Sequence, residues 1–376
     1  MRMSGVIYLP QAKWKSGERR AFKTAHGDRF APAFKITPAG SFDADEQRVL
    51  TPTEYLGRFG HQLAESRGRR LAFIDAELVD DDRHRNAVDV HPLTELLERA
   101  RLAGANAAPI FSRSSSPEYM EAVRRFLRFD QNSIACLRLG LQELEDISSA
   151  SELVGWLDQS GGVPARTVLL IDGGPLQIDE PEDLAHLLAV QMARLVARDT
   201  WLKVFWSATS FPNKPTLKAG ALARFPRSDW KLYEAILRIR DEFPVVPMFS
   251  DYMLEYPSDY IPVRVSPTAK LLYSTEEEYI YCKGRSTRVE DKYKNIFPVA
   301  AQLAAIDDIK DERYSLGDAY IRRLASGVGK TGNASMWRWC ATDHHLAMVD
   351  EQLTKALGIS RQRVPAQVTA EQLQLV

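Results

Sequence analysis

Three aspartates of this sequence each follow a short apolar run, and their side chains can serve as acids, bases or ligand anchors. Asp75, Asp172 and Asp251 stand at or just beyond the ends of the runs 71–74, 167–171 and 245–249. The carboxyl ends of parallel strands meet on one face of an α/β protein, where active sites usually lie. Asp251 has no obvious cation partner in this pattern, which makes it the best lone candidate for a general base. We therefore take Asp172, Asp251 and Asp75 as the candidate catalytic residues.

Two cations belong to the same pattern. Lys35 and Arg138 lie near the ends of two further apolar runs. Charges beside apolar strands are costly unless they are paired. We expect Lys35 to meet Asp75 and Arg138 to meet Asp172, because the strands that carry each pair are expected to be neighbours. Such pairs either only satisfy each other or surround a polar ligand with fixed charges, and we favour the ligand site.

Further side chains near the expected strand ends can bond to a ligand or pack against it. The loop 207–214 is rich in hydroxyl groups and ends in a lysine, so it either binds an anion or forms an ordinary turn. In the last expected helix, His344 shares a face with apolar residues and is expected to be buried, whereas His345 faces elsewhere, toward solvent or the site. The candidate ligand-binding residues are Lys35, Arg138, Ser207, Ser210, Phe211, Tyr252, Tyr273, Thr275 and His345.

The same residues allow two cofactor hypotheses. Asp75 and Glu77 lie on one face two positions apart, and Asp172 can add a third oxygen, an arrangement that suits magnesium rather than zinc. No histidine ends an expected strand, so the zinc pattern of barrel hydrolases is missing. A lysine at the end of the first strand, Lys35, also suits a Schiff base with pyridoxal phosphate, but the Gly/Ser pattern for its phosphate is missing. We expect no cofactor, with magnesium as the alternative.

Alternation of short apolar runs with stretches of helical periodicity indicates the elements that must position these groups. It predicts an α/β fold, a (β/α)8 TIM-like barrel built from eight such units. A doubly wound open sheet is the competitor, but the turn after Lys35 lacks the glycine pattern of that fold. The expected strands are 30–36, 71–74, 107–111, 133–139, 167–171, 202–207, 245–249 and 270–273.

Segments outside these units complete the expected architecture, which is a single domain with a polar tail. An N-terminal segment is expected to plug the lower end of the barrel, a long loop follows the seventh strand, and two extra helices form a C-terminal extension from about residue 312. The ranges are 5–24 for the plug, 251–268 for the loop, 312–325 and 333–357 for the helices, 1–357 for the domain and 358–376 for the tail.

Composition excludes several classes of protein. The 376 residues carry a formal net charge of −1, which argues against a general nucleic-acid or membrane-surface binder. No run of about 18 apolar residues exists, and the N-terminus lacks the apolar core of a signal peptide. The three cysteines, Cys136, Cys282 and Cys340, are widely spaced and odd in number, as in a protein with reduced thiols. We expect a cytoplasmic protein without membrane contact.

Short motifs spread over nearly the whole chain occur in a recognisable order. They are Tyr8-x-Pro10 with Lys13-x-Lys15-x-Gly17-Glu18, Ser210-Phe211-Pro212, Arg227-x-Asp229-Trp230, Asp251-Tyr252, Tyr273-x-Thr275, Gly332-Asn333 with Trp337, and His344-His345. In these motifs and their order the chain resembles the bacteriophage beta protein family, which is also widespread in bacteria. It departs from the family pattern at Ser250, where the family tends to have glycine, and at Leu272, where an arginine is common. The departure at Leu272 puts in doubt any anion-binding role carried by that arginine.

The resemblance implies a setting rather than a chemistry. The phage and mobile-element setting of the family implies a role in phage–host conflict, either as antiviral defence or as a phage accessory function. From the residues, one hypothesis is an enzyme of the hydrolase or lyase type that acts on a small anionic molecule, such as a nucleotide or a phosphorylated metabolite. Asp251 and Asp172 would then be the acid–base groups, with Lys35 and Arg138 stabilising charge. The alternative is a non-catalytic barrel that binds a protein partner or sequesters a ligand.

Overall fold

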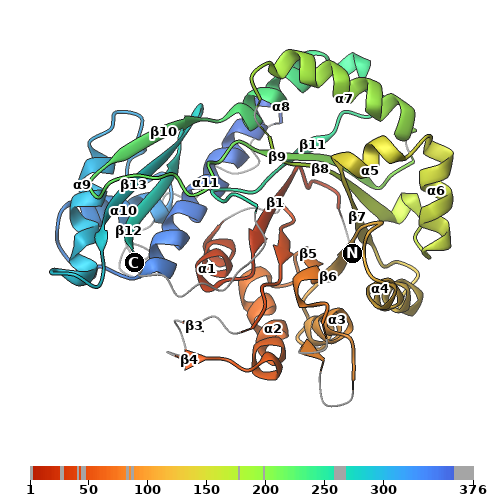
Figure 1. Cartoon of the computed structure of the whole chain (residues 1–376), viewed down its shortest axis with the longest axis horizontal. Coiled ribbons are helices and arrows are strands. Elements are labelled where there is room, and N and C mark those ends of the chain that lie inside the picture. Colours follow the sequence, from red (N-terminus) through yellow and green to blue (C-terminus); the bar gives the residue numbers. More distant parts are fainter. Residues whose placement is uncertain are drawn as a thin grey trace.

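A closed barrel of parallel strands forms the body of the molecule in the computed structural model (Figure 1). The structure describes residues 3–25, 29–39, 42–43, 48–81, 84–85, 89–176, 178–197, 200–257 and 268–359. Within these residues, eight strands close in the order β1-β11-β9-β8-β7-β6-β5-β2, and every neighbouring pair is parallel. The strands are β1 (Tyr8–Lys13), β2 (Ala33–Lys35), β5 (Ala72–Asp75), β6 (Ala107–Phe111), β7 (Ala135–Gly140), β8 (Thr167–Pro175), β9 (Lys203–Thr209) and β11 (Met248–Asp251). The predicted TIM-like barrel is confirmed.

Helices return the chain from each strand to the next along the outside of the barrel, as Figure 1 shows. Several begin at a proline, whose missing N–H costs nothing in a first turn, directly after a residue whose side chain caps the helix. Thr51, His91 and Ser116 are such capping residues. The helices are α1 (Ser16–Thr24), α2 (Pro52–Arg67), α3 (Pro92–Leu102), α4 (Pro117–Phe129), α5 (Leu141–Asp146), α6 (Ala150–Gln159), α7 (Pro181–Leu195) and α8 (Ser228–Arg238). Residues Phe42–Asp43 (β3) and Arg48–Val49 (β4) pair as a short two-stranded ribbon.

Side-chain alternation along the strands divides the apolar residues into two layers. One cluster fills the barrel interior and includes Phe73, Cys136 and Leu170. The other, which includes Ile74 and Leu137, lies between the strands and the helices. A polar residue two positions after an interior residue therefore points into the barrel mouth.

The first barrel strand lies earlier in the chain than predicted. Residues 5–24 were expected to plug the lower end of the barrel, but Tyr8–Lys13 forms β1, and Ser16–Thr24 forms α1, which packs on α2. Of this segment, Val6 packs in the interior cluster, as a plug would. The assignment failed because the strand contains a proline and polar residues, which usually count against a central strand.

The predicted eighth barrel strand at 270–273 is wrong. These residues belong to β12 (Thr268–Ser274), which lies in a separate antiparallel sheet in the order β10-β13-β12. The other strands of this small sheet are β10 (Leu222–Pro226) and β13 (Glu278–Ser286). The physical reason is the tight turn at 275–277, which folds the chain back into a hairpin. The Thr275 N–H donates to the Glu278 carbonyl oxygen, and the Thr275 hydroxyl accepts from the Glu278 N–H.

Three helices pack with the small sheet at the C-terminal side of the chain and form with it the C-terminal unit (Figure 1). They are α9 (Ile296–Ala304), α10 (Leu316–Ala325) and α11 (Ala334–Ala356), and the last two confirm the two predicted extra C-terminal helices. Helix α11 contacts both β12 and the N-terminal α1, and thereby joins this unit to the barrel. Within the described residues, no helix is both long and apolar enough to span a membrane. Most of the predicted polar tail and part of the 251–268 loop fall outside the described residues, at 360–376 and 258–267.

Candidate active site

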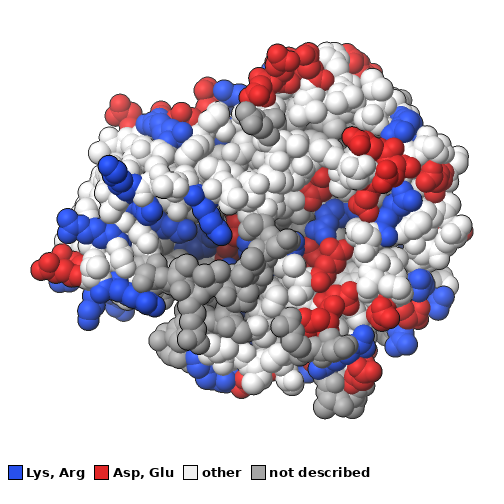
Figure 2. All heavy atoms as spheres, in the orientation of Figure 1, with Lys and Arg blue, Asp and Glu red and all other residues white. Residues whose placement is uncertain are grey.

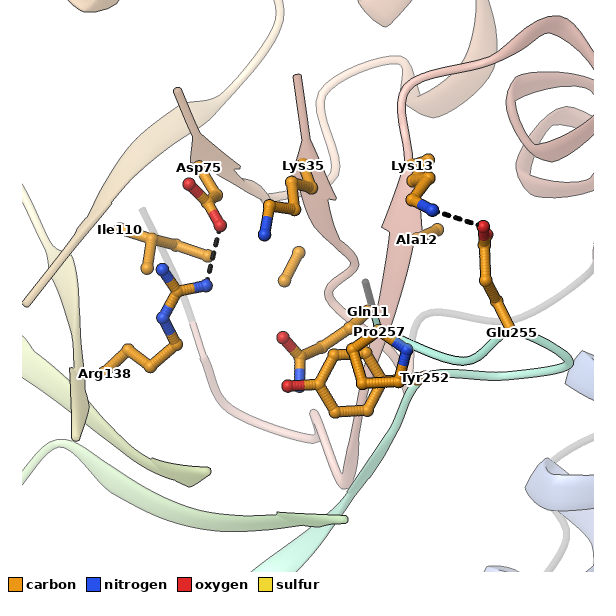
Figure 3. Close-up of a pocket in the computed structure, with 11 residues that line it drawn as sticks. Gln11, Ala12, Lys13, Lys35, Asp75, Ile110, Arg138, Tyr252, Glu255 and Pro257 are labelled. Carbon is orange, nitrogen blue, oxygen red and sulfur yellow. Dashed lines mark hydrogen bonds and ion pairs between the residues drawn. The ribbon is translucent and has the colours of Figure 1, made fainter. Parts of the chain in front are cut away.

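A small cavity lies at the carboxyl ends of the barrel strands, where the sequence placed the site (Figure 3). Its volume is ≈ 70 Å³. Lys13, Lys35 and Asp75 stand side by side across β1, β2 and β5, because the strand register pairs them directly. We call this space the mouth cavity, and its lining residues are Gln11, Ala12, Lys13, Ala33, Lys35, Asp75, Ile110, Arg138, Tyr252, Glu255 and Pro257.

Arg138 is held by two carboxylates on one side of the mouth cavity. Its Nη1 donates to Asp75 Oδ2 at 2.7 Å, and its Nη2 donates to Glu77 Oε2 at 2.5 Å. Burial by itself would raise the pKa of Asp75, but the charges of Arg138 and Lys35 outweigh it and hold that pKa below its usual value. The predicted direct pair between Arg138 and Asp172 is therefore replaced by a pair with Asp75, because the guanidinium reaches back toward β5.

Asp172 bonds to a tyrosine instead of a cation. Tyr252 Oη donates to Asp172 Oδ2 at 2.5 Å, and the Gly174 N–H donates to Oδ1 at 3.0 Å. Burial raises the pKa of Asp172 even though the nearby Arg138 lowers it. Burial and the Asp172 charge together raise the pKa of Tyr252 well above its ordinary value. Asp172 therefore takes up a proton more readily than Asp75 does.

Lys35 points into the mouth cavity toward the space that Asp75 and Arg138 also face (Figure 3). Lys13, its neighbour in the register, instead binds Glu255 Oε1 at 2.5 Å. Among the described residues, Lys35 has no hydrogen-bond or ion-pair partner, although the negative charge of Asp75 is near. Lys35 and Asp75 are thus neighbours in the register, and no hydrogen bond joins them among the described residues.

Asp251 lies outside the mouth cavity. It shares its strand face with Phe249, which packs between the strands and the helices, so its carboxylate turns away from the barrel interior. It is fully buried and accepts bonds from Tyr8 Oη at 2.6 Å, from His345 Nε2 at 2.9 Å and from the Met253 N–H at 3.0 Å. The sequence showed no obvious cation partner for Asp251; its hydrogen-bond donors are a tyrosine, a backbone N–H and a histidine, and Tyr8 and His345 come from distant parts of the chain.

Comparison of the sequence with known protein families shows which family the chain belongs to. The family model named Beta protein matches residues 8–350. The chain belongs to the Beta protein family. No curated protein matches this chain in sequence. The solved structures it is similar to include the YdjI aldolase from Escherichia coli K12, at 8% identity and a TM-score of 0.34, over 94% of this chain and 91% of that one. Another is a putative lyase/mutase from Burkholderia cenocepacia J2315, at 15% identity and a TM-score of 0.31, over 66% of this chain and 76% of that one. Neither likeness bears on chemistry.

The motifs that resemble the Beta protein family meet in a buried network beside the mouth cavity. His345 joins Asp251 to Ser274, whose Oγ lies 2.9 Å from His345 Nδ1. His344, which is buried as predicted, binds Asp318 at 2.8 Å and the Ser274 carbonyl oxygen at 2.8 Å. His345 is also fully buried, so it reaches neither solvent nor the cavity. These contacts join α11 to the end of β11 and to the small sheet.

Most other predicted ligand-binding residues of this Beta protein family member also contact protein groups rather than the mouth cavity. Ser210 Oγ donates to Asp229 Oδ1 at 2.8 Å, and Tyr273 Oη donates to Asp318 Oδ1 at 2.6 Å. Ser207 is fully buried beneath the mouth cavity, where it bonds Gln11 Nε2 at 2.7 Å. Phe211 packs in an apolar cluster and Thr275 bonds the turn of the hairpin. Only Lys35, Arg138 and Tyr252 of the predicted ligand-binding residues line the mouth cavity.

Three polar residues that line the mouth cavity were absent from the predicted site. Gln11 and Lys13 belong to β1, and Glu255 follows β11. The alternation of Leu9, Gln11 and Lys13 is the pattern of a strand that enters a polar mouth, and it would have indicated the first two. In the described part of the chain, no three His, Cys, Asp or Glu side chains are placed to hold a metal ion. The magnesium alternative stays a prediction.

Proposed function

We propose that this member of the Beta protein family binds a small anionic ligand in the mouth cavity and acts on it as an enzyme of the hydrolase or lyase type. The observation that carries the proposal is Lys35, a cation that faces the cavity without a partner among the described residues. Lys35 is only partly exposed, and an ammonium group partly withdrawn from water gains from a partner of opposite charge. An anion that enters this space also meets Arg138, whose charge lies beside it.

The chemistry available at the mouth is proton transfer combined with charge stabilisation. The raised pKa of Asp172 suits a group that exchanges a proton, and Tyr252 links that carboxyl group to the mouth cavity. Lys35 and Arg138 would stabilise negative charge that develops on the ligand. Asp251 is fully buried and touches no cavity surface, so this proposal gives it no direct step.

Binding of inorganic phosphate and pyrophosphate, measured by isothermal titration calorimetry, tests the site. We expect the Lys35→Met variant to lose about tenfold or more in affinity, because one charge-assisted contact is worth roughly 1.5–3 kcal/mol. Lys231→Met, at an exposed position on α8, is the matched control and should bind like the unaltered chain. If Lys35→Met binds these anions as tightly as the control does, the mouth cavity is not the anion site.

The second candidate is a non-catalytic barrel that sequesters a ligand or binds a protein. The saturation of Arg138 by Asp75 and Glu77 favours it, since paired charges contribute little to turnover. The Asp172→Asn variant separates the two candidates. If biological activity persists in this variant while its fold stays intact, proton transfer by Asp172 at this mouth is ruled out.

The biological setting is a proposal of its own. The phage and mobile-element setting of the family favours a role in phage–host conflict, as antiviral defence or a phage accessory function. Plaque counts on bacteria that express the chain, compared with bacteria that do not express it, test it. Equal counts for a range of phages would leave the chain without a role in that conflict.

A further inference from the structure

The mouth cavity holds only part of a metabolite. Its volume of ≈ 70 Å³ is well below the roughly 300–1,000 Å³ of pockets that enclose a whole drug-sized ligand. A small group, such as one phosphate, fits next to Lys35, and the rest of a larger ligand must lie outside. The surface next to the opening therefore decides which ligand class the protein takes.

That surface carries lysine side chains that form no ion pair with a described residue. On the small sheet, the register places Lys270 of β12 directly opposite Lys283 of β13, so both side chains leave the same face of the sheet. Directly opposed like charges destabilise a strand pair. Among the described residues, Lys270 has no ion-pair or hydrogen-bond partner, and Lys283 bonds only the Leu217 carbonyl oxygen, at 2.8 Å. We call this surface the lysine face.

The lysine face continues into the mouth cavity. Lys270 interacts electrostatically with Lys283, Lys15, Arg338 and Glu255, and Glu255 lines the cavity. Partial desolvation, together with the charge of Arg338, lowers the pKa of Lys270 to about 8. Figure 2 shows Lys and Arg side chains gathered over the small sheet and α11, whereas most Asp and Glu side chains lie on the opposite side of this view.

The positive charge is in excess in this region. The carboxylates of this region, Glu18 and Glu255, are bridged by Arg338. Its Nε lies 3.1 Å from Glu18 Oε1, and its Nη2 lies 3.1 Å from Glu255 Oε2. Lys13 shares Glu255. The two carboxylates are thus occupied within the chain, and nothing among the described residues neutralises Lys270.

Aromatic side chains lie among these cations. Tyr281 is half-buried, and Lys270 Nζ lies 5.7 Å from the centre of its ring. Tyr256, also partly exposed, packs against the same apolar cluster as Tyr281, next to the segment that contributes Glu255. A nucleobase gains energy when it stacks on an aromatic side chain, and a neighbouring lysine can bind the phosphates attached to that base.

We propose that the lysine face is the outer half of the ligand site and that the ligand is a nucleoside polyphosphate. Its terminal phosphate enters the mouth cavity at Lys35, its remaining phosphates pass Lys15 and Lys270, and its base stacks on Tyr281. The proposal rests on anion binding at the mouth and adds a ligand class to it. A ligand of this class carries both several phosphates for the lysines and a planar base for Tyr281, whereas pyrophosphate has no base to stack.

Calorimetric titrations with pyrophosphate, a nucleoside triphosphate and a single-stranded oligonucleotide test the proposal. We expect the nucleoside triphosphate to bind about tenfold more tightly than pyrophosphate, since stacking of one base is worth roughly 1–3 kcal/mol. Tyr281→Leu should remove most of that difference and leave pyrophosphate affinity unchanged, whereas Lys270→Met should weaken binding of the nucleoside triphosphate more than binding of pyrophosphate. Lys270→Met removes a repulsion between like charges, so a thermal midpoint equal to or above that of the unaltered chain confirms that its sheet is intact.

The outcomes separate this proposal from the one it rests on. Equal affinities for pyrophosphate and the nucleoside triphosphate, with both lost in Lys35→Met, would overturn the lysine-face proposal and retain the mouth site. An oligonucleotide that binds more tightly than any mononucleotide, and does so through Lys270, would overturn it in favour of nucleic acid. If neither anion binds, both proposals fail together.

Discussion

Asp75 ends β5 and Asp172 lies near the end of β8, yet their surroundings push their pKa values in opposite directions. Asp75 accepts a bond from Arg138, and that charge with Lys35 keeps the carboxyl group ionised. Asp172 accepts a bond from the neutral Tyr252, and burial dominates. Paired carboxyl groups with separated pKa values are a common basis for dividing the roles of charge and proton transfer.

Substitution of the two aspartates should affect stability with opposite signs. The raised pKa of Asp172 means that its ionised form costs stability once the pH exceeds its ordinary value of 3.8, so Asp172→Asn should match or exceed the unaltered chain at neutral pH. The lowered pKa of Asp75 means that its contribution is present at neutral pH and is lost as the pH falls below 3.8.

Asp75→Asn should therefore lower the free energy of unfolding at neutral pH by about 3 kcal/mol, as when one partner of a buried pair is removed. Urea unfolding followed by circular dichroism measures both variants. A larger loss in Asp172→Asn than in Asp75→Asn would contradict the assignment of their charge states.

His345 should make stability depend on pH in a second window. Burial lowers its pKa below the ordinary value of 6.5 even though Asp251 raises it, so the folded state holds a neutral imidazole. As the pH falls below 6.5, the unfolded state gains a proton that the folded state does not, and stability decreases. The His345→Gln variant should lack that part of the slope, whereas His61→Gln, at an exposed position, should keep it. Unfolding midpoints between pH values of about 5 and 8 provide the measurement.

At the scale of elements, the sequence predicted seven of the eight barrel strands, and the remaining error has two physical sources. Pro10 and the polar residues of β1 disguised a central strand, which leaves Lys13 and Gln11 out of the predicted site. β12 reads as one more buried strand, because local apolar content does not distinguish parallel from antiparallel pairing. Asp251 shows a further limit of sequence-based prediction. Alternation with Phe249 indicates which side of the strand its side chain takes, but its partners Tyr8 and His345 follow only from tertiary packing.

Packing of α10 against α11 depends on one glycine. A Cβ at Gly317 would run into the Cys340 carbonyl oxygen, so Gly317→Ala must move the helices apart and should cost about 1–3 kcal/mol. Gly155, inside α6, has open space around the same position, and Gly155→Ala should instead stabilise the chain by roughly 0.5–1 kcal/mol. Thermal unfolding of the two variants measures the difference. A stable Gly317→Ala variant would mean that this helix contact is looser than described.

At the scale of the whole molecule, the C-terminal unit is tied to the barrel by buried polar contacts as well as by apolar packing. Arg338 on α11 binds Glu18 on α1 and Glu255 after β11, and His345 binds Asp251. Groups buried in this way lose their partners if one part unfolds alone. The predicted single domain follows from these ties as a proposal.

Unfolding should therefore be one transition. Far-ultraviolet circular dichroism and tryptophan fluorescence should give coincident curves in urea, because Trp206 in the barrel and Trp339 in the C-terminal unit report on both parts. Two resolved transitions, with Trp339 exposed first, would show that the C-terminal unit is a separate domain.

The position of β1 has a consequence for the newborn chain. β1 pairs with β2 on one side soon after synthesis, but its other edge binds β11, and Ser250 lies 241 positions after its partner Leu9. On the ribosome this edge stays open until nearly two thirds of the protein has emerged, and an open edge invites association with other chains. Pro10 does not protect this edge, because Tyr8 and Trp14 bond toward the β2 side and backbone alternation turns Pro10 to that side too. The N–H and C=O groups of Leu9 and Gln11 therefore wait unpaired for β11.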